Sequence, residues 1–412
     1  MAAPPVTVPP RERMLAAQLL SNPDYRSYWL GSTAFAFGIW GFILSMGYSA
    51  KLLTDSPLLV SLVSVAYFLP MFVGALPSGV LADAVDRRKT VIWSRTVGTL
   101  GALGLAGLTA TDALGYPALV ALSALTGATV VSEVAARQAY VAQIVRPDQV
   151  VGATALGSVQ GGIARVVGPL AAGALIATSG ETAGYLLFAV ANAACVVVFL
   201  RIRTSGKPPR AAGRPVAELV EGVRYLRRSP DALAITAVGL LTGVVGWVFL
   251  ALMPIMVADE LGGGALMLGV LSTMVGLGSV PPSVLLAVRS GGPRREGRLF
   301  YLATLAWGVA VVVWGLTGSP VVAAVALAVC GAGNGLQQVL LRTLLLRIVD
   351  PAFHGRVMGT LMLTWGGSVV GTLAGGAIAE SLGVGPVIAL SGAAIVAITC
   401  AVLVVRPSTW RL

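Results

Sequence analysis

The sequence predicts an all-α polytopic membrane protein with twelve transmembrane helices in two pseudo-symmetric six-helix bundles. Three observations predict this class. First, 56% of the 412 residues are hydrophobic and only 11% are charged, which is too little charge to cover a soluble protein. Second, the hydrophobic residues form long runs separated by Pro, Gly and charged residues. Third, the second half of the chain partly repeats the first. Because a helix satisfies its own backbone hydrogen bonds, a helical bundle is the spanning structure that fits such runs.

A helix needs about 20 apolar residues to cross the hydrocarbon core of a membrane. Runs of this kind lie near 28–50, 58–82, 91–110, 117–144, 151–178, 184–200, 232–257, 266–288, 299–317, 321–347, 357–379 and 385–405. The predicted organisation is therefore a cytoplasmic N-terminal tail at 1–27, an N-terminal bundle at 28–200, a cytoplasmic linker at 201–231, a C-terminal bundle at 232–405 and a C-terminal tail at 406–412.

The basic residues predict how the bundle lies in the plasma (inner) membrane. With both termini in the cytoplasm, all but two of the 28 Lys and Arg residues fall at or near the inner face, and the exceptions are Lys51 and Arg165. Lys and Arg concentrate on the cytoplasmic side of membrane proteins, so both termini are expected there. The predicted outer loops instead carry acidic residues, namely Asp55, Asp112, Glu181, Asp259, Glu260 and Glu380.

The linker at 201–231 begins with Pro, Gly and Arg, which predict a flexible connection. Its second part has apolar residues at helical spacing: Val216, Leu219, Val220, Val223 and Leu226. This spacing predicts an amphipathic helix on the inner leaflet, with its Arg side chains toward the lipid headgroups.

The repeat appears in three pairs of segments with nearly one offset along the chain. They are Arg165-Val-Val-Gly-Pro with Ser368-Val-Val-Gly-Thr, Pro77-Ser-Gly-Val-Leu-Ala with Pro282-Ser-Val-Leu-Leu-Ala, and Ile144-Val-Arg-Pro with Ile348-Val-Asp-Pro. Parallel six-helix repeats are typical of transporters that expose a central site alternately to the two sides of the membrane.

The stretch GVLADAVDRRK contains Asp83 at the end of the second apolar run, followed by Asp86, Arg87, Arg88 and Lys89. It resembles the signature loop between the second and third helices of the major facilitator superfamily, a family of secondary transporters. The usual pattern has glycine where this chain has Asp86.

This resemblance implies a polar latch at the cytoplasmic gate, formed by Asp83, Arg87 and Arg88. It also implies that Asp83 contacts the start of the eleventh helix near Arg356 when the gate is shut.

The fifth span contains Gly162, Gly168, Pro169 and Gly173. Such a segment bends a helix and lets a neighbouring helix approach closely. It resembles the antiporter motif of exporters in the superfamily, although ordinary tight packing is the alternative. With the basic linker and the pattern Asp350-Pro-x3-Gly355-Arg356-Val357, the chain resembles the drug-efflux and siderophore-export branch of the family.

Three charged residues are expected inside the spans: Glu133, Arg137 and Arg165. A charge at the centre of a membrane costs about 2.5–3.5 kcal/mol on insertion scales, so each invites a functional explanation. Glu133 and Arg165 are predicted at similar depth on antiparallel helices, and Glu133 and Arg137 can pair at i,i+4.

Two interpretations of Glu133 remain open. It is either the proton-titrating carboxylate, held near Arg165, or a partner in a permanent ion pair. The repeat aligns Glu133 with Gln337 and Arg165 with Ser368. This alignment favours a coupling site in the first half and a more neutral, substrate-shaping second half.

Candidates for the wall of a substrate cavity are aromatic and amide side chains well inside the spans. They are Phe37, Trp40, Tyr67, Trp247 and Trp365, with Asn334, Gln337 and Gln338 as polar contacts. Aromatic side chains that face the lipid are the alternative.

The sequence has no phosphate-binding glycine loop and no catalytic triad, so it is not expected to be an enzyme. Its three cysteines lie in apolar runs and it has one histidine, His354, so neither a metal nor a cofactor is expected. The net charge of +11 follows membrane topology, which argues against nucleic acid binding. The expected partners are a small-molecule substrate, protons and the lipid bilayer, with the chain as a monomer.

The function expected from these features is proton-coupled export, by antiport, of a small and partly hydrophobic drug or secondary metabolite. Siderophore export is one alternative. A lipid or lysolipid flippase and a non-transporting membrane receptor are the others.

Overall fold

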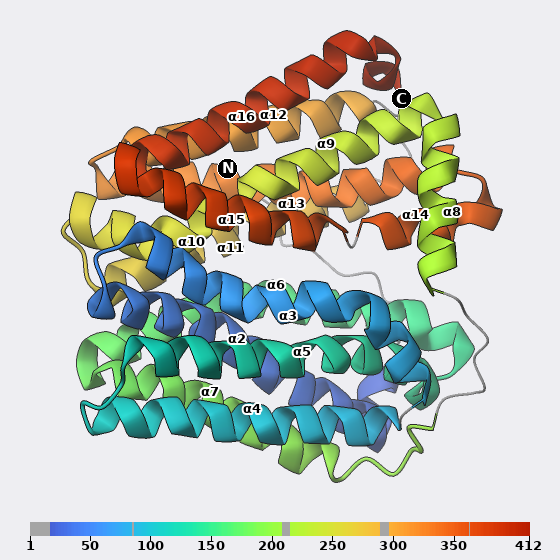
Figure 1. Cartoon of the computed structure of the whole chain (residues 1–412). Helices are drawn as coiled ribbons and strands as arrows, with labels where there is room; N and C mark the ends of the chain where they lie inside the picture. The colour runs from blue at the N-terminus through green and yellow to red at the C-terminus, as the bar shows by residue number, and fades with distance from the viewer. Residues whose placement is uncertain (1–16, 85, 208–214, 289–295, 362) are drawn as a thin grey trace, which may run out of the picture.

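The computed structural model describes residues 17–84, 86–207, 215–288, 296–361 and 363–412, and it gives only the backbone for 75–84, 132, 135, 215–219, 282–288 and 363–365. These residues form a bundle of long helices in two groups (Figure 1). Ten helical segments of the described chain are long and apolar enough to cross a membrane. The predicted class, an all-α polytopic membrane protein, is confirmed.

The first group of helices comes from the first half of the chain and is the lower one in Figure 1. In this group α2 packs against α6 and α7, α4 packs against α5 and α7, and α3 packs against α5. The members are α2 (Pro23–Leu53), α3 (Pro57–Ala84), α4 (Arg87–Ala110), α5 (Tyr116–Ile144), α6 (Val150–Ser179) and α7 (Glu181–Phe199).

The second group comes from the second half of the chain, with α8 (Pro215–Arg228) at its edge. Here α13 packs against α11 and α12, and α16 packs against α9 and α12. The members are α9 (Pro230–Gly246), α10 (Val248–Ile255), α11 (Ala265–Val288), α12 (Glu296–Leu316), α13 (Pro320–Ile348), α14 (His354–Thr360), α15 (Leu363–Leu382) and α16 (Val384–Val405).

Two predicted spans are not continuous helices. The seventh, 232–257, divides at Trp247 into α9 and α10, and the eleventh, 357–379, divides after Thr360 into α14 and α15. Gly246 comes directly before the first break, and glycine is the residue that least resists leaving the helical conformation. Hydropathy remains high through the seventh span, so hydropathy alone does not indicate this break.

The two groups meet along two pairs of helices, α6 with α11 and α3 with α15. The repeat pairs α3 with α11 and α6 with α15. Exchanging the two halves therefore turns one interface into the other, as expected for repeats related by an axis along the membrane normal.

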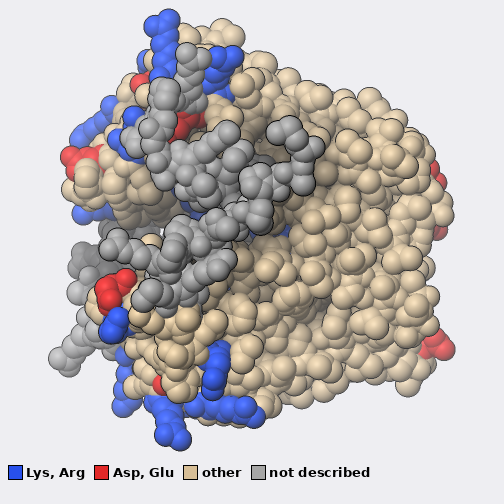
Figure 2. Space-filling model, turned by 180° about the vertical axis from the view of Figure 1, so that it is seen from behind, with Lys and Arg blue, Asp and Glu red and all other residues tan. Residues whose placement is uncertain are grey.

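Charge divides the molecule into two ends (Figure 2). Nearly all the Lys and Arg residues visible on that face gather at one end, here called the base-rich end. It is the end at which α4 begins, with Arg88, and α7 ends, just before Arg201. At the opposite, base-poor end α2 ends and α3 begins, with Lys51, Asp55 and Glu380.

At the base-poor end the two halves are joined by polar contacts. The ammonium of Lys51 lies 3.0 Å from an Asp259 carboxylate oxygen. The backbone N–H of Leu58 donates to Glu380 at 3.1 Å, and the hydroxyl of Ser56 also donates to this carboxylate. A carboxylate of α15 thus caps the amino terminus of α3, where the helix dipole favours negative charge. This end is closed between the halves.

Toward the base-rich end, the glycines of α6 have more space around them. The contact between α6 and α11 extends to Gly162, where an added Cβ would meet Val280 at an ordinary 3.5 Å. Further along, an added Cβ at Gly161 or Gly157 would meet nothing within 4 Å, and Gly157 is exposed. These glycines of α6 therefore pack less closely on the described residues of the second half than Gly173, where an added Cβ would lie 2.6 Å from the carbonyl oxygen of Ala265.

Candidate functional site

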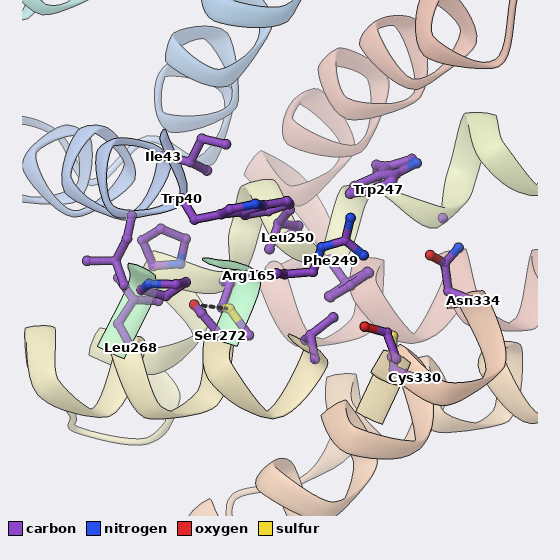
Figure 3. A pocket seen from close by; sticks show the side chains of 18 of the residues that line it. Trp40, Ile43, Arg165, Trp247, Phe249, Leu250, Leu268, Ser272, Cys330 and Asn334 are labelled. Atoms are coloured by element: carbon purple, nitrogen blue, oxygen red, sulfur yellow. Dashed lines mark hydrogen bonds between the residues drawn. The ribbon is translucent and has the colours of Figure 1, made fainter. Parts of the chain in front are cut away.

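A pocket with about 820 Å³ of empty space lies between the two halves. From the first half, α2 contributes Trp40 and α6 contributes Arg165. From the second half, the break between α9 and α10 contributes Trp247, and Phe249 and Asn334 lie further along the wall (Figure 3). Discontinuous helices that line a central cavity are typical of transporter sites. Three predicted cavity residues, Trp40, Trp247 and Asn334, therefore line one pocket.

Arg165 is the charged residue in this pocket wall. Its guanidinium carbon lies 5.0 Å from the centroid of the Trp40 ring, within the range of a cation–π contact. Figure 3 shows the side chain pointing into the space between Trp40 and Phe249. Its buried Nε has no hydrogen-bond partner, and no carboxylate in the described part of the chain lies within 4 Å of it.

The glycines of α6 explain how Arg165 reaches this place. A Cβ at Gly168 would lie 2.7 Å from the carbonyl oxygen of Phe37, and a Cβ at Gly173 would lie 2.6 Å from that of Ala265. Only glycine allows α6 to approach α2 and α11 this closely. Pro169, which belongs to the predicted motif together with Gly162, Gly168 and Gly173, lines the pocket directly. The motif thus holds α6 between the two halves with Arg165 facing the space they share.

Glu133 lies elsewhere, in a buried ion cluster inside the first half. One carboxylate oxygen is 2.8 Å from Nε of Arg137, and the other is 3.7 Å from Nη2 of Arg95. Arg95 has no exposed surface; it donates to Asn192 at 3.2 Å, and its guanidinium lies 3.8 Å from the centroid of the Phe35 ring. We call Arg95, Glu133 and Arg137 the first-half ion cluster.

Glu133 and Arg165 form no ion pair among the described residues, since the partners of Glu133 are Arg95 and Arg137. The reason is helix packing, because α5 packs mainly against α3 and α4, whereas α6 packs against α2 and α11. The i,i+4 contact between Glu133 and Arg137 does occur.

Arg95 is a member of the buried ion cluster that the sequence analysis does not predict, because Arg95 falls among the bases near the inner face. Its position inside the apolar run 91–110 was the available signal. An arginine several residues into a span is as costly as Glu133, and the two charges offset each other.

Four other predicted cavity residues do not line the pocket. Tyr67 is 1% exposed and packs its ring against Phe42 and Phe68. Gln337 is buried and donates to the hydroxyl of Thr242 at 3.1 Å. Phe37 and Gln338 are half-buried and lie outside the pocket wall.

Of the predicted cytoplasmic latch, Arg87 and Arg88 have described side chains and contact other helices of the first half. Arg88 donates to the carbonyl oxygens of Phe199 at 3.1 Å and Leu200 at 2.8 Å, where α7 ends. Arg87 donates to Ala139 of α5 at 3.2 Å and makes further contacts. Arg88 thus lies at the carboxyl end of α7, where a cation is stabilising, and both arginines tie helices of the first half together. The side chains of Asp83 and Trp365 lie outside the described residues.

Arg356, the expected partner of Asp83, lies 3.1 Å from Glu221 of α8. The next residue of α8, Gly222, lies against the backbone carbonyl of Arg356. Tyr225 stacks on Phe353 with ring centroids 4.6 Å apart. These contacts fix α8 to α14 and to the turn that precedes it.

Comparisons with known proteins agree with this architecture. The chain is 27% identical to the enterobactin exporter EntS of Shigella boydii serotype 4 (strain Sb227), over 89% of this chain and 86% of that protein. It is also 27% identical to the enterobactin exporter EntS of Shigella flexneri, over 76% and 73% of the two chains.

Two solved structures show the same fold at low identity. One is a POT family transporter in complex with 5-aminolevulinic acid, with a TM-score of 0.74, 14% identity and 96% coverage of both chains. The other is the nucleoside transporter NupG, with a TM-score of 0.71, 12% identity and coverage of 93% of this chain and 98% of that one.

The family model of the Major Facilitator Superfamily matches residues 28–368, which is most of the chain. This family and the matched relatives are transporters, not enzymes. The chain is a transporter that belongs to the major facilitator superfamily.

Proposed function

We propose that the chain is a proton-coupled exporter of a small, partly hydrophobic compound and that it works by alternating access. The pocket wall is the observation that carries this proposal, because Trp40 and Arg165 come from one half while Trp247 and Asn334 come from the other. A site shared by two halves opens to one side or the other when the halves rock against each other.

The two ends support a direction for this motion. Lys51 with Asp259, and Leu58 with Glu380, join the halves at the base-poor end. Along α6, an added Cβ would meet Ala265 at 2.6 Å at Gly173 but would meet nothing within 4 Å at Gly157 or Gly161, nearer the base-rich end. If both termini are cytoplasmic, as the positive charge at the base-rich end favours, this arrangement is one that loads substrate from the cytoplasm. Release to the outside then requires the contacts at the base-poor end to break.

For proton coupling we propose Glu133. Its ion cluster lies entirely in the first half, and it contains two guanidinium groups for one carboxylate. Neutralising Glu133 leaves Arg95 and Arg137 without their counter-ion, and removing one partner of a buried ion pair is strongly unfavourable. Protonation of Glu133 therefore requires a rearrangement in which Arg95 and Arg137 gain other partners or water. The alternative role of Glu133 is a permanent ion pair that never takes up a proton.

Siderophore export is the second candidate function. The enterobactin exporters, matched at 27% identity over most of the chain, favour it. The aromatic and apolar lining of the pocket, with Arg165 as its charged group, is compatible with such a substrate as well as with a drug.

The test uses everted membrane vesicles in which respiration acidifies the lumen. Vesicles with the protein should accumulate one or more of three probes, namely Hoechst 33342, norfloxacin and enterobactin. Collapsing both the pH gradient and the membrane potential with the protonophore CCCP should abolish this accumulation, and vesicles without the protein should show none. Uptake that survives CCCP would refute proton coupling. Preference for enterobactin over both drugs would favour the siderophore function.

A further inference from the structure

The polar groups of the pocket offer hydrogen-bond donors without matching acceptors. Arg165 carries only N–H donors, and its buried Nε has no partner. On the opposite wall, the side-chain N–H group of Asn334 is also buried without a partner. Buried donors normally find acceptors, so two orphaned donors in one pocket indicate a missing acceptor.

Charge gives the same indication. The described pocket wall holds Arg165 and no Asp or Glu. Glu133, the buried acid of the first half, is already engaged by Arg95 and Arg137. A cation at membrane depth is costly and normally has a partner, yet the described chain places no carboxylate beside Arg165.

We infer that Arg165 and Asn334 form a binding subsite for an anionic oxygen group of the transported compound, such as a carboxylate or an ionised phenol. This inference rests on the proposed transport function and adds the charge of the substrate to it. Arginine binds such groups strongly because both charge and paired N–H donors contribute. The substrate thus brings the counter-ion that the protein lacks.

The remainder of the substrate lies against apolar walls. Trp40 and Phe249 flank the guanidinium (Figure 3). A second pocket, with about 560 Å³ of empty space, shares Ile43, Trp247 and Leu250 with the first. The predicted ligand is therefore an amphiphilic anion, with its acidic group at Arg165 and an aromatic or aliphatic body that extends toward the second pocket.

The test measures binding of two probes of equal size to the full chain in lipid nanodiscs. They are 2-naphthoate, which is anionic, and 2-naphthamide, which is neutral. The wild type should bind the carboxylate about tenfold more tightly. Arg165→Gln should bring the ratio of the two dissociation constants close to one, chiefly by weakening naphthoate. Arg165→Lys, which keeps the charge but not the fork of donors, should give an intermediate ratio.

Arg146→Gln is the matched control, because Arg146 is an exposed arginine paired with Asp148 outside the pocket. It should leave the ratio as in the wild type. Equal binding of the two probes to the wild type, or binding of neither, would overturn the inference whether or not the variants fold. A preference that survives in folded Arg165→Gln would also overturn it.

Transport separates this inference from the proposed function. If the wild type prefers 2-naphthoate to 2-naphthamide but vesicles accumulate none of Hoechst 33342, norfloxacin and enterobactin, the subsite stands and the exporter proposal fails. If vesicles accumulate one of these three compounds but the wild type binds the two naphthalene compounds equally, the exporter proposal stands and the subsite fails.

Discussion

The buried centres of the two halves have the same helical framework but opposite chemistry. In the first half, Glu133 lies between Arg95 and Arg137. At the matching position of the second half, Gln337 makes a neutral hydrogen bond to Thr242. The second half shows that this helix packing needs no buried ions. The ions of the first half are therefore not required by the fold, and their cost favours a role in transport.

The same contrast appears in the pocket. Arg165 of α6 corresponds in the repeat to Ser368 of α15, and Ser368 lines the second pocket instead. Among the described residues, the buried charges and the charged residue of the pocket wall thus belong to the first half, and the second half supplies a neutral part of that wall. The predictions below test whether this asymmetry carries function.

The largest effect is expected for Glu133→Gln, which gives the first half the residue found in the second. The variant should still bind substrate and exchange it downhill, because the pocket does not include Glu133. Its accumulation of substrate in everted vesicles should fall to the level of vesicles without the protein, because an amide cannot carry the coupling proton. Full accumulation by this variant would show that Glu133 is a structural bridge, and Asp83 would become the next candidate.

A thermodynamic cycle should show how strongly the cluster is coupled. Arg95→Met and Glu133→Gln should each lower thermal stability, and the double variant should lose less than the sum. Contacting residues typically differ from additivity by about 0.5–3 kcal/mol. Thermal unfolding in detergent measures the four proteins. Thr242→Val with Gln337→Leu is the matched cycle in the second half, where a neutral hydrogen bond should give a smaller coupling. Equal coupling energies in both halves would remove the asymmetry.

The contacts at the base-poor end should control access from outside. Asp259→Asn weakens the contact with Lys51 and should shift the population toward an outward-open arrangement. Cys330 lines the pocket and serves as the reporter once Cys195 and Cys400 are replaced by Ala. A membrane-impermeant thiol reagent added to intact cells should label it several times faster than in the parent. Asp112→Asn, in another outer turn, is the control. An unchanged labelling rate in Asp259→Asn would remove this gate.

The smallest effect concerns external pH. A hydrogen bond from Lys51 lowers the pKa of Asp55 below that of a free aspartate side chain. A carboxyl whose pKa is lowered by folding stabilises the folded state at pH values above the pKa of a free aspartate. This stabilisation is lost as the pH falls through the lowered pKa. The contact should therefore stay intact between pH 5 and pH 8. Because the Asp55 side chain is 97% exposed, Asp55→Asn should change transport little at any pH in this range. A marked change in labelling of Cys330 between pH 8 and pH 5 that depends on Asp55 would contradict this assignment.

The sequence predicted the fold well because the long apolar runs and the repeat can be recognised along the chain without knowing how the helices pack. It predicted the site less well, for two physical reasons. Helices that are apolar on all sides give no sign of which face lines a cavity, so Trp40 and Asn334 could not be separated from Tyr67 and Gln337. Depth along a helix also does not reveal its neighbours, so Arg165 was expected where Arg95 lies.

The most direct test of the account is proton movement driven by substrate in liposomes that contain the purified protein and pyranine in an acidic lumen. Adding to the outside a compound that the protein transports should raise the lumenal pH of wild-type liposomes, because protons leave as substrate enters. Glu133→Gln liposomes should exchange the same compound without this rise. Equal proton release by both proteins would contradict the claim that the first-half ion cluster couples protons to export.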